Sequence, residues 1–199
     1  MSTTEIYAVD KGGDVVSKRD LRNSWGGAMA IWTSLSQRHL PGSDGFGGVM
    51  NGFEDLFALI KTDKLERWEK IVLLTTCDNV MVRAENFIET AEAFEKFHEE
   101  YKAANEGKVF HMKTQADLLR ELAGEVEEHG WRAICWNQTS VNGDCPWYGC
   151  RIELSEDHPE YDPDGDNEDQ RPYNIDRDKD HWFAWDDLDP TPQAAEASG

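Results

Sequence analysis

Three cysteines in the second half of the chain, Cys135, Cys145 and Cys150, could offer thiolates to a zinc ion. His129 or His158 could then complete a four-ligand site. Structural zinc sites usually draw their thiolates from close pairs of the CxxC type, and the sequence contains no such pair. We therefore expect core or surface thiols here, because a reduced cysteine behaves mainly as a small apolar side chain.

Two aspartate-rich segments, residues 162–168 and 176–180, place carboxylates at alternate positions, as a calcium-binding loop does. The first segment lacks the glycine that the sixth position requires and has Tyr173 in place of the bidentate glutamate. The second has His181 at the sixth position, although Asp187 stands at the twelfth. We expect a solvated acidic extension here. The alternative is a small metal-binding module or metal-dependent enzyme that uses Cys or Asp ligands.

Motifs that carry catalysis are missing from the sequence. Residues 45–48 are rich in glycine but lack the lysine that follows in a phosphate-binding loop. The chain contains neither a GxSxG nor an HExxH pattern, and its six histidines are scattered. The sequence therefore predicts no enzyme, no catalytic residues and no cofactor.

The charge of the chain excludes several classes of function. Twenty basic residues stand against 40 acidic ones, which gives a formal net charge of −20. This charge repels phosphate, so direct binding of nucleic acid or of an anionic membrane is not expected. The first residues have neither a basic segment nor an apolar run of the kind that starts a signal peptide. We expect a cytoplasmic protein with reduced thiols.

The acidic residues are concentrated near the end of the sequence. Residues 151–199 hold sixteen acidic and four basic side chains, so this quarter carries most of the excess charge. A shift of composition near Leu154 marks a boundary. We expect one globular domain over residues 1–154 and an acidic, aspartate- and aromatic-rich extension over residues 155–199, partly docked and disordered at its end.

The domain is expected to be α+β, mostly helical with a small antiparallel sheet. Residues 5–9 and 14–16 flank a glycine turn and predict a β-hairpin. Ser17 predicts the start of a helix that ends before Pro41. Thr114 predicts the start of another, which Gly130 ends. Apolar stripes predict further helices over residues 53–60 and 65–72 and a third that starts at Phe87 and ends near Gly107, and residues 79–83 predict a short strand.

A second hairpin is predicted from Trp131 to Leu154. Asn142 and Gly143 lie between two runs of β-forming residues and suit a two-residue turn. With that turn, Cys135 would lie opposite Cys150 in the ladder.

The acidic extension contains an aromatic group that a solubilising tail would not need. Trp182, Phe183 and Trp185 fall within four residues and are surrounded by aspartates. They could pack against the body of the same molecule, or they could enter a pocket of a partner, where aromatic anchors dominate binding. Packing against the body would fix the neighbouring aspartates as an ordered negative surface.

The stretch from Arg22 to Trp32, the Leu-Pro loop after it and the Asn86-Phe87 pair that opens a helix resemble uncharacterised small proteins of bacteriophages. The resemblance covers residues 5–105 at most and brings no catalytic residues. In its acidic character the chain is also similar to phage inhibitors of host defence, including DNA-mimic and anti-CRISPR types.

These observations lead to the hypothesis of a phage-type interaction protein that binds and blocks a nucleic-acid-handling host protein. Its acidic surface would occupy a basic groove of that partner. A virion or scaffold component is the other alternative. The expected contact residues are seven aspartates and two tryptophan anchors: Asp162, Asp164, Asp166, Asp178, Asp180, Asp186, Asp187, Trp182 and Trp185.

Overall fold

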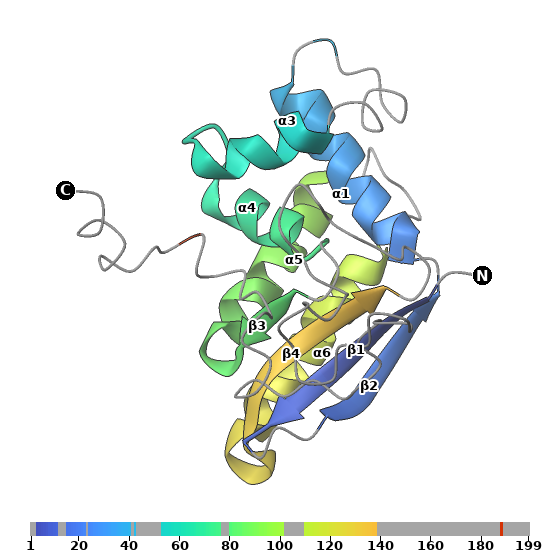
Figure 1. Cartoon of the computed structure of the whole chain (residues 1–199), viewed down its shortest axis with the longest axis vertical. Coiled ribbons are helices and arrows are strands. Elements are labelled where there is room, and N and C mark those ends of the chain that lie inside the picture. Colours follow the sequence, from blue (N-terminus) through green and yellow to red (C-terminus); the bar gives the residue numbers. More distant parts are fainter. Residues whose placement is uncertain are drawn as a thin grey trace, which may run out of the picture.

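The computed structural model describes residues 3–11, 15–22, 24–40, 42, 53–76, 80–101, 110–138 and 188. In these residues a four-stranded antiparallel sheet and five α-helices form an α+β fold, as the sequence predicted (Figure 1). Helical residues outnumber strand residues among those described.

The sheet has the order β2-β1-β4-β3, and every neighbouring pair is antiparallel. Strands β1 (Thr3–Asp10) and β2 (Val15–Arg22) form the first predicted hairpin. Ser17 does not start a helix, and that prediction was wrong. Residues 15–22 instead pair along the length of β1, and helix α1 (Ser24–His39) starts only after the strand.

The remaining elements are helices of different lengths and two further strands. They are α3 (Phe53–Ala58), η1 (Leu59–Lys61), α4 (Arg67–Leu74), β3 (Met81–Arg83), η2 (Ala84–Asn86), α5 (Phe87–Tyr101), α6 (Phe110–His129) and β4 (Trp131–Gln138). The predicted start at Thr114 was wrong, because α6 begins at Phe110 and Thr114 lies within it. The predicted end of this helix at Gly130 is confirmed. Gly130 follows the last residue of α6 with a φ of 68°, a left-handed conformation in which glycine commonly ends a helix.

Strand β4 is paired on both of its edges. It runs beside β1 along its length and beside β3 at residues 133–135. Tyr7 and Met81 are therefore the two cross-strand neighbours of Cys135. The predicted register, with Cys150 opposite Cys135, was wrong, because a strand residue has only two such neighbours. The second arm of that predicted hairpin lies outside the described residues.

The main core forms between the helices and one face of the sheet. Ala8, Ile134 and Trp136 point into it from the strands and meet Phe94 of α5 and Leu119 of α6. Two buried hydrogen bonds fix the indole rings in this core. Trp136 Nε1 donates to Gln115 Oε1 at 2.6 Å, and Trp32 Nε1 donates to Thr76 Oγ1 at 2.7 Å. Satisfied indole donors allow these large rings to be buried at little polar cost.

Leu188 is the described residue of the acidic extension. It is partly buried and packs against the main core. The extension therefore contacts the body of the protein at this position. The predicted boundary near Leu154 lies outside the described residues.

Candidate functional site

The residues that the sequence singled out for partner binding are not among those that the structure describes. All nine lie outside the described ranges: Asp162, Asp164, Asp166, Asp178, Asp180, Trp182, Trp185, Asp186 and Asp187. They remain predictions.

Of the predicted zinc ligands, only Cys135 and His129 are described. Cys135 is a fully buried thiol on the sheet, whereas His129 is exposed at the end of α6, with its ring 5.4 Å from that of Trp131. Within the described ranges, no three or more His, Cys, Asp or Glu side chains gather as metal ligands would. Cys145, Cys150 and His158 lie outside those ranges.

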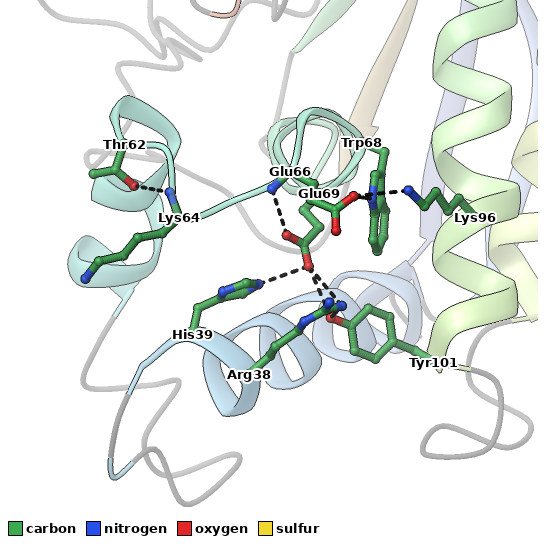
Figure 2. Close-up of polar contacts among 9 residues, drawn as sticks. All are labelled: Arg38, His39, Thr62, Lys64, Glu66, Trp68, Glu69, Lys96 and Tyr101. Carbon is green, nitrogen blue, oxygen red and sulfur yellow. Dashed lines mark hydrogen bonds and ion pairs between the residues drawn. The ribbon is translucent and has the colours of Figure 1, made fainter.

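The most distinctive polar site in the described structure is a buried carboxylate that the sequence analysis missed. Glu69 is the third residue of α4, and its side chain is 0% exposed. Its Oε2 accepts a hydrogen bond from the backbone N–H of Glu66, 2.9 Å away, at the start of the helix (Figure 2). This bond satisfies a helix-terminal donor, and the negative charge suits the N-terminal end of a helix.

The second oxygen of Glu69 collects donors from two other helices (Figure 2). His39 Nε2 lies 3.0 Å from Oε1 and Arg38 Nη1 lies 3.4 Å from it, both at the C-terminal end of α1. The Tyr101 hydroxyl, at the last residue of α5, donates to the same oxygen at 3.3 Å. One carboxylate therefore joins α1, α4 and α5, and we call Glu69, His39, Arg38 and Tyr101 the Glu69 junction.

The electrostatics of the junction follow from burial and neighbouring charge. Burial is the main cause of the raised pKa of Tyr101, and the Glu69 carboxylate raises it further, while the hydrogen bond from Arg38 opposes the change. That bond, 3.1 Å from Arg38 Nη1 to the Tyr101 oxygen, is also the main cause of the raised pKa of Arg38. Arg38 thus stays charged and Tyr101 stays neutral, which keeps both as donors toward Glu69.

A second polar cluster lies beside the junction, on the surface. Trp68 Nε1 and Lys96 Nζ donate to Glu66 Oε2 at 2.7 and 3.1 Å, and the Lys96 ammonium lies 4.9 Å from the Trp68 ring centroid (Figure 2). These two donors, Trp68 first, lower the pKa of Glu66. The Glu66 and Lys96 side chains are exposed and the Trp68 ring is buried, and together they continue the link between α4 and α5.

This arrangement is suited to holding helices together more than to catalysis. The Glu69 carboxylate is inaccessible to solvent, and its two oxygens take part in three hydrogen bonds and an ion pair with Arg38. A substrate would have to displace these donors to reach it. A signal for the site was present in the sequence, because Glu66 and Glu69 stand three apart immediately before an apolar helical run.

The exposed sides of α5 and α6 form a strongly acidic surface. These two helices pack against each other, and together they contain ten acidic residues against three Lys or Arg. We call the seven exposed acids of the pair the α5–α6 acidic surface: Glu92, Glu99, Glu100, Asp117, Glu121, Glu127 and Glu128.

Two of the three cations in this pair of helices are already used. Arg120 binds Glu95 through two hydrogen bonds of 2.9 and 2.7 Å, and Lys96 pairs with Glu66. The Arg120 guanidinium holds the pKa of Glu95 below its usual value. The acids of the α5–α6 acidic surface therefore keep most of their negative charge uncompensated by the cations of their own helices.

Like charges repeat at helical spacing along this surface. Asp117 and Glu121 stand four residues apart, whereas Glu125 in the next turn pairs with Lys18 at 3.9 Å and accepts a hydrogen bond from Trp131 Nε1 at 3.4 Å. Two like charges four residues apart destabilise an exposed helix by about 0.2–0.5 kcal/mol.

No family model, no curated protein and no solved structure matches this chain. None of the described helices is long and apolar enough to cross a membrane.

Proposed function

We propose that this protein is an acidic interaction protein that binds a partner with a basic surface and competes there with nucleic acid. The partner is a nucleic-acid-handling protein of a bacterial host, and the protein acts as a phage-type inhibitor of host defence in the host cytoplasm. It requires no cofactor and binds no nucleic acid itself.

The observation that carries this proposal is the α5–α6 acidic surface. It stands on two packed helices, so the backbone positions that carry its seven carboxylates are fixed before binding. A preorganised negative surface attracts a basic groove over a long range and speeds the encounter. The net charge of −20 adds to this attraction.

The aspartates of the extension are the second proposed contact region. Asp162, Asp164, Asp166, Asp178, Asp180, Asp186 and Asp187 supply its charge, and Trp182 and Trp185 are the apolar anchors of that segment. Leu188, which packs against the core, ties this region to the same body as the α5–α6 acidic surface.

Charge reversal tests the proposal. Glu92→Lys, Glu99→Lys and Glu121→Lys are combined in one variant, and its capture of proteins from bacterial lysate is compared with that of wild type. The matched control places lysine at three exposed acids outside these two helices, Asp20, Asp55 and Asp63. We expect loss of the captured partner in the first variant and retention in the control.

The fold of each variant is checked by circular dichroism and by thermal melting. Unchanged capture by a folded α5–α6 variant would remove this surface from the proposal. Equal losses in the variant and in the control would indicate a response to net charge alone.

A further inference from the structure

One arginine stands within the α5–α6 acidic surface. Arg120 is exposed on α6 and donates from Nε and Nη2 to the two oxygens of Glu95 on α5, at 2.9 and 2.7 Å. Two parallel hydrogen bonds between one guanidinium and one carboxylate form the most specific pairing that arginine makes with an acid. The acidic surface therefore already holds one guanidinium, which comes from its own chain.

Two further carboxylates lie near this guanidinium. Glu92 stands three residues before Glu95 on α5, and Asp117 stands three residues before Arg120 on α6, so each lies on the same side of its helix as the pair. The hydrogen bond to Glu95 is the main cause of the raised pKa of Arg120, and the charges of Glu95, Glu92 and Asp117 raise it further, while burial opposes the change. Three carboxylates thus act on one positive charge.

The pair of Arg120 and Glu95 can open without unfolding the two helices. Both side chains are 41% exposed, and an exposed ion pair contributes little to stability because water solvates the separated charges. Both helices are anchored instead by apolar side chains that are buried in the main core, among them Phe94, Leu118 and Leu122. The guanidinium on Glu95 can therefore be exchanged for another cation.

We propose that Glu92, Glu95 and Asp117 form a guanidinium-binding site, that Arg120 fills it in the unbound protein, and that an arginine of the partner takes the place of Arg120 on Glu95. The carboxylates alone would not indicate a ligand, but the guanidinium that Glu95 already holds shows which cation fits. This inference deepens the proposed function and rests on it for the existence of the partner.

The site selects arginine over lysine. The planar fork of a guanidinium matches two carboxylate oxygens, whereas an ammonium group is a point charge. Arginine is also the side chain that holds phosphate groups in this bidentate way. A surface that binds nucleic acid through arginines would therefore fit this site better than one that uses lysines.

The site can be tested with the purified protein and two synthetic peptides, an oligoarginine and an oligolysine of equal length. Their dissociation constants are measured by fluorescence anisotropy at low salt. Arg120→Gln empties the site. Its control, Lys64→Gln, removes the same charge from an exposed residue outside α5 and α6, whose side chain points away from α5 (Figure 2).

A second pair of variants tests the carboxylate. Glu95→Gln removes the charge that accepts both hydrogen bonds from Arg120. Its control, Glu127→Gln, removes the same charge from an exposed position about two turns beyond Arg120 on α6. Circular dichroism and thermal melting establish that each variant is folded.

We expect the wild type to bind oligoarginine at least about threefold more tightly than oligolysine. Relative to Lys64→Gln, Arg120→Gln should bind oligoarginine about two- to sixfold more tightly, because an exposed ion pair of ordinary strength no longer competes for Glu95. Glu95→Gln should lose the preference for arginine, and Glu127→Gln should keep it. If Arg120→Gln does not fold, Arg120→Lys replaces it, and this variant should also bind oligoarginine more tightly than the wild type.

Several results would overturn the proposal. A gain in Arg120→Gln no larger than that in Lys64→Gln would indicate a response to net charge alone. Equal binding of the two peptides by the wild type would remove the selection of a guanidinium. If the wild type does not distinguish the peptides but the charge-reversal variant of the α5–α6 acidic surface loses its captured partner, this inference fails and the proposed function stands. If the peptide results hold and that variant still captures the partner, the guanidinium site stands and the proposed function fails.

Discussion

Removal of the Glu69 charge is the perturbation whose effect the structure defines best. Glu69→Gln keeps the size of the side chain but replaces an acceptor oxygen with an amide group that donates. His39 Nε2 and Arg38 Nη1 then face a neutral or opposing group at 3.0 and 3.4 Å. The junction of α1, α4 and α5 is expected to weaken.

The magnitude follows from the exposure of the partners. Removing one member of a buried ion pair typically costs about 3–5 kcal/mol because the other is left unpaired. The Arg38 side chain is 42% exposed and can return to water, whereas that of His39 is only 14% exposed. We therefore expect a loss of about 3 kcal/mol for Glu69→Ala and about 2 kcal/mol for Glu69→Gln.

Urea unfolding followed by the fluorescence of the eight tryptophans at pH 7 measures this loss. In a chain of this length about 2 kcal/mol corresponds to a decrease of about 4–8 °C in Tm. Arg38→Gln should cost less than about 1 kcal/mol because its side chain is partly solvated. The control, Glu99→Gln on the exposed side of α5, should stay within about 0.5 kcal/mol of wild type. A Glu69→Gln value equal to that control would refute the assigned role of the junction.

Four further predictions concern stability. Gly124→Ala should stabilise the protein by about 0.5–1 kcal/mol, because this residue is exposed within α6 and a Cβ there meets no atom within 4 Å. Gly130→Ala should destabilise the protein by about 1 kcal/mol, because Gly130 has a φ of 68°. Urea titrations of the two variants test these opposite signs. A double-mutant cycle of Glu95→Gln and Arg120→Gln should give a coupling of about 0.2–1 kcal/mol at pH 7. Because the pKa of Glu95 is lowered in the folded state, that coupling is present above its ordinary value of 4.5 and should vanish as the pH falls through the lower folded value. Burial lowers the pKa of His111 below 6.5, so its NMR titration midpoint should lie under that value, and its contribution to stability should decrease as the pH falls from 6.5. Raising the salt concentration from about 0.02 to 0.3 M should screen repulsion within the α5–α6 acidic surface and raise Tm by about 2–4 °C, and a fall in Tm would contradict its assignment as uncompensated charge.

The regular elements could be predicted from local patterns in the sequence. The apolar stripe from Phe87 to Tyr101 and the stop at Gly130 match α5 and the end of α6. The helix start predicted at Ser17 was wrong. A serine side chain can cap a helix, but the pairing of residues 15–22 with β1 depends on contacts that a local pattern does not contain. The strand register predicted for Cys135 was wrong for the same reason, because its cross-strand neighbours come from β1 and β3, which lie more than fifty residues away in the chain.

The Glu69 junction was harder to predict than the helices it joins. A glutamate three residues after Glu66 indicates a helix start, and that much was available from the sequence. Its burial depends on the ends of α1 and α5, because Arg38, His39 and Tyr101 are each thirty or more residues away from Glu69 in the sequence. The sequence contains 40 acidic residues, and without the fold nothing indicates which of them lies between these three side chains.

The acidic surface was anticipated only in part. Composition predicted an excess of negative charge and assigned it to residues 151–199. The α5–α6 acidic surface escaped notice because its acids are spread over two segments, and only the packing of the helices brings them together.

The proposed function requires this protein to occupy the basic, nucleic-acid-binding surface of a partner. The most direct test has two steps. Proteins that this protein captures from nuclease-treated bacterial lysate at low and at high salt are first identified. The displacement of nucleic acid from the purified partner is then measured as this protein is added. We expect one nucleic-acid-handling protein that is held at low salt, released at high salt and stripped of its nucleic acid as this protein is added. A partner that keeps its nucleic acid while bound, or capture that does not respond to salt, would contradict the account.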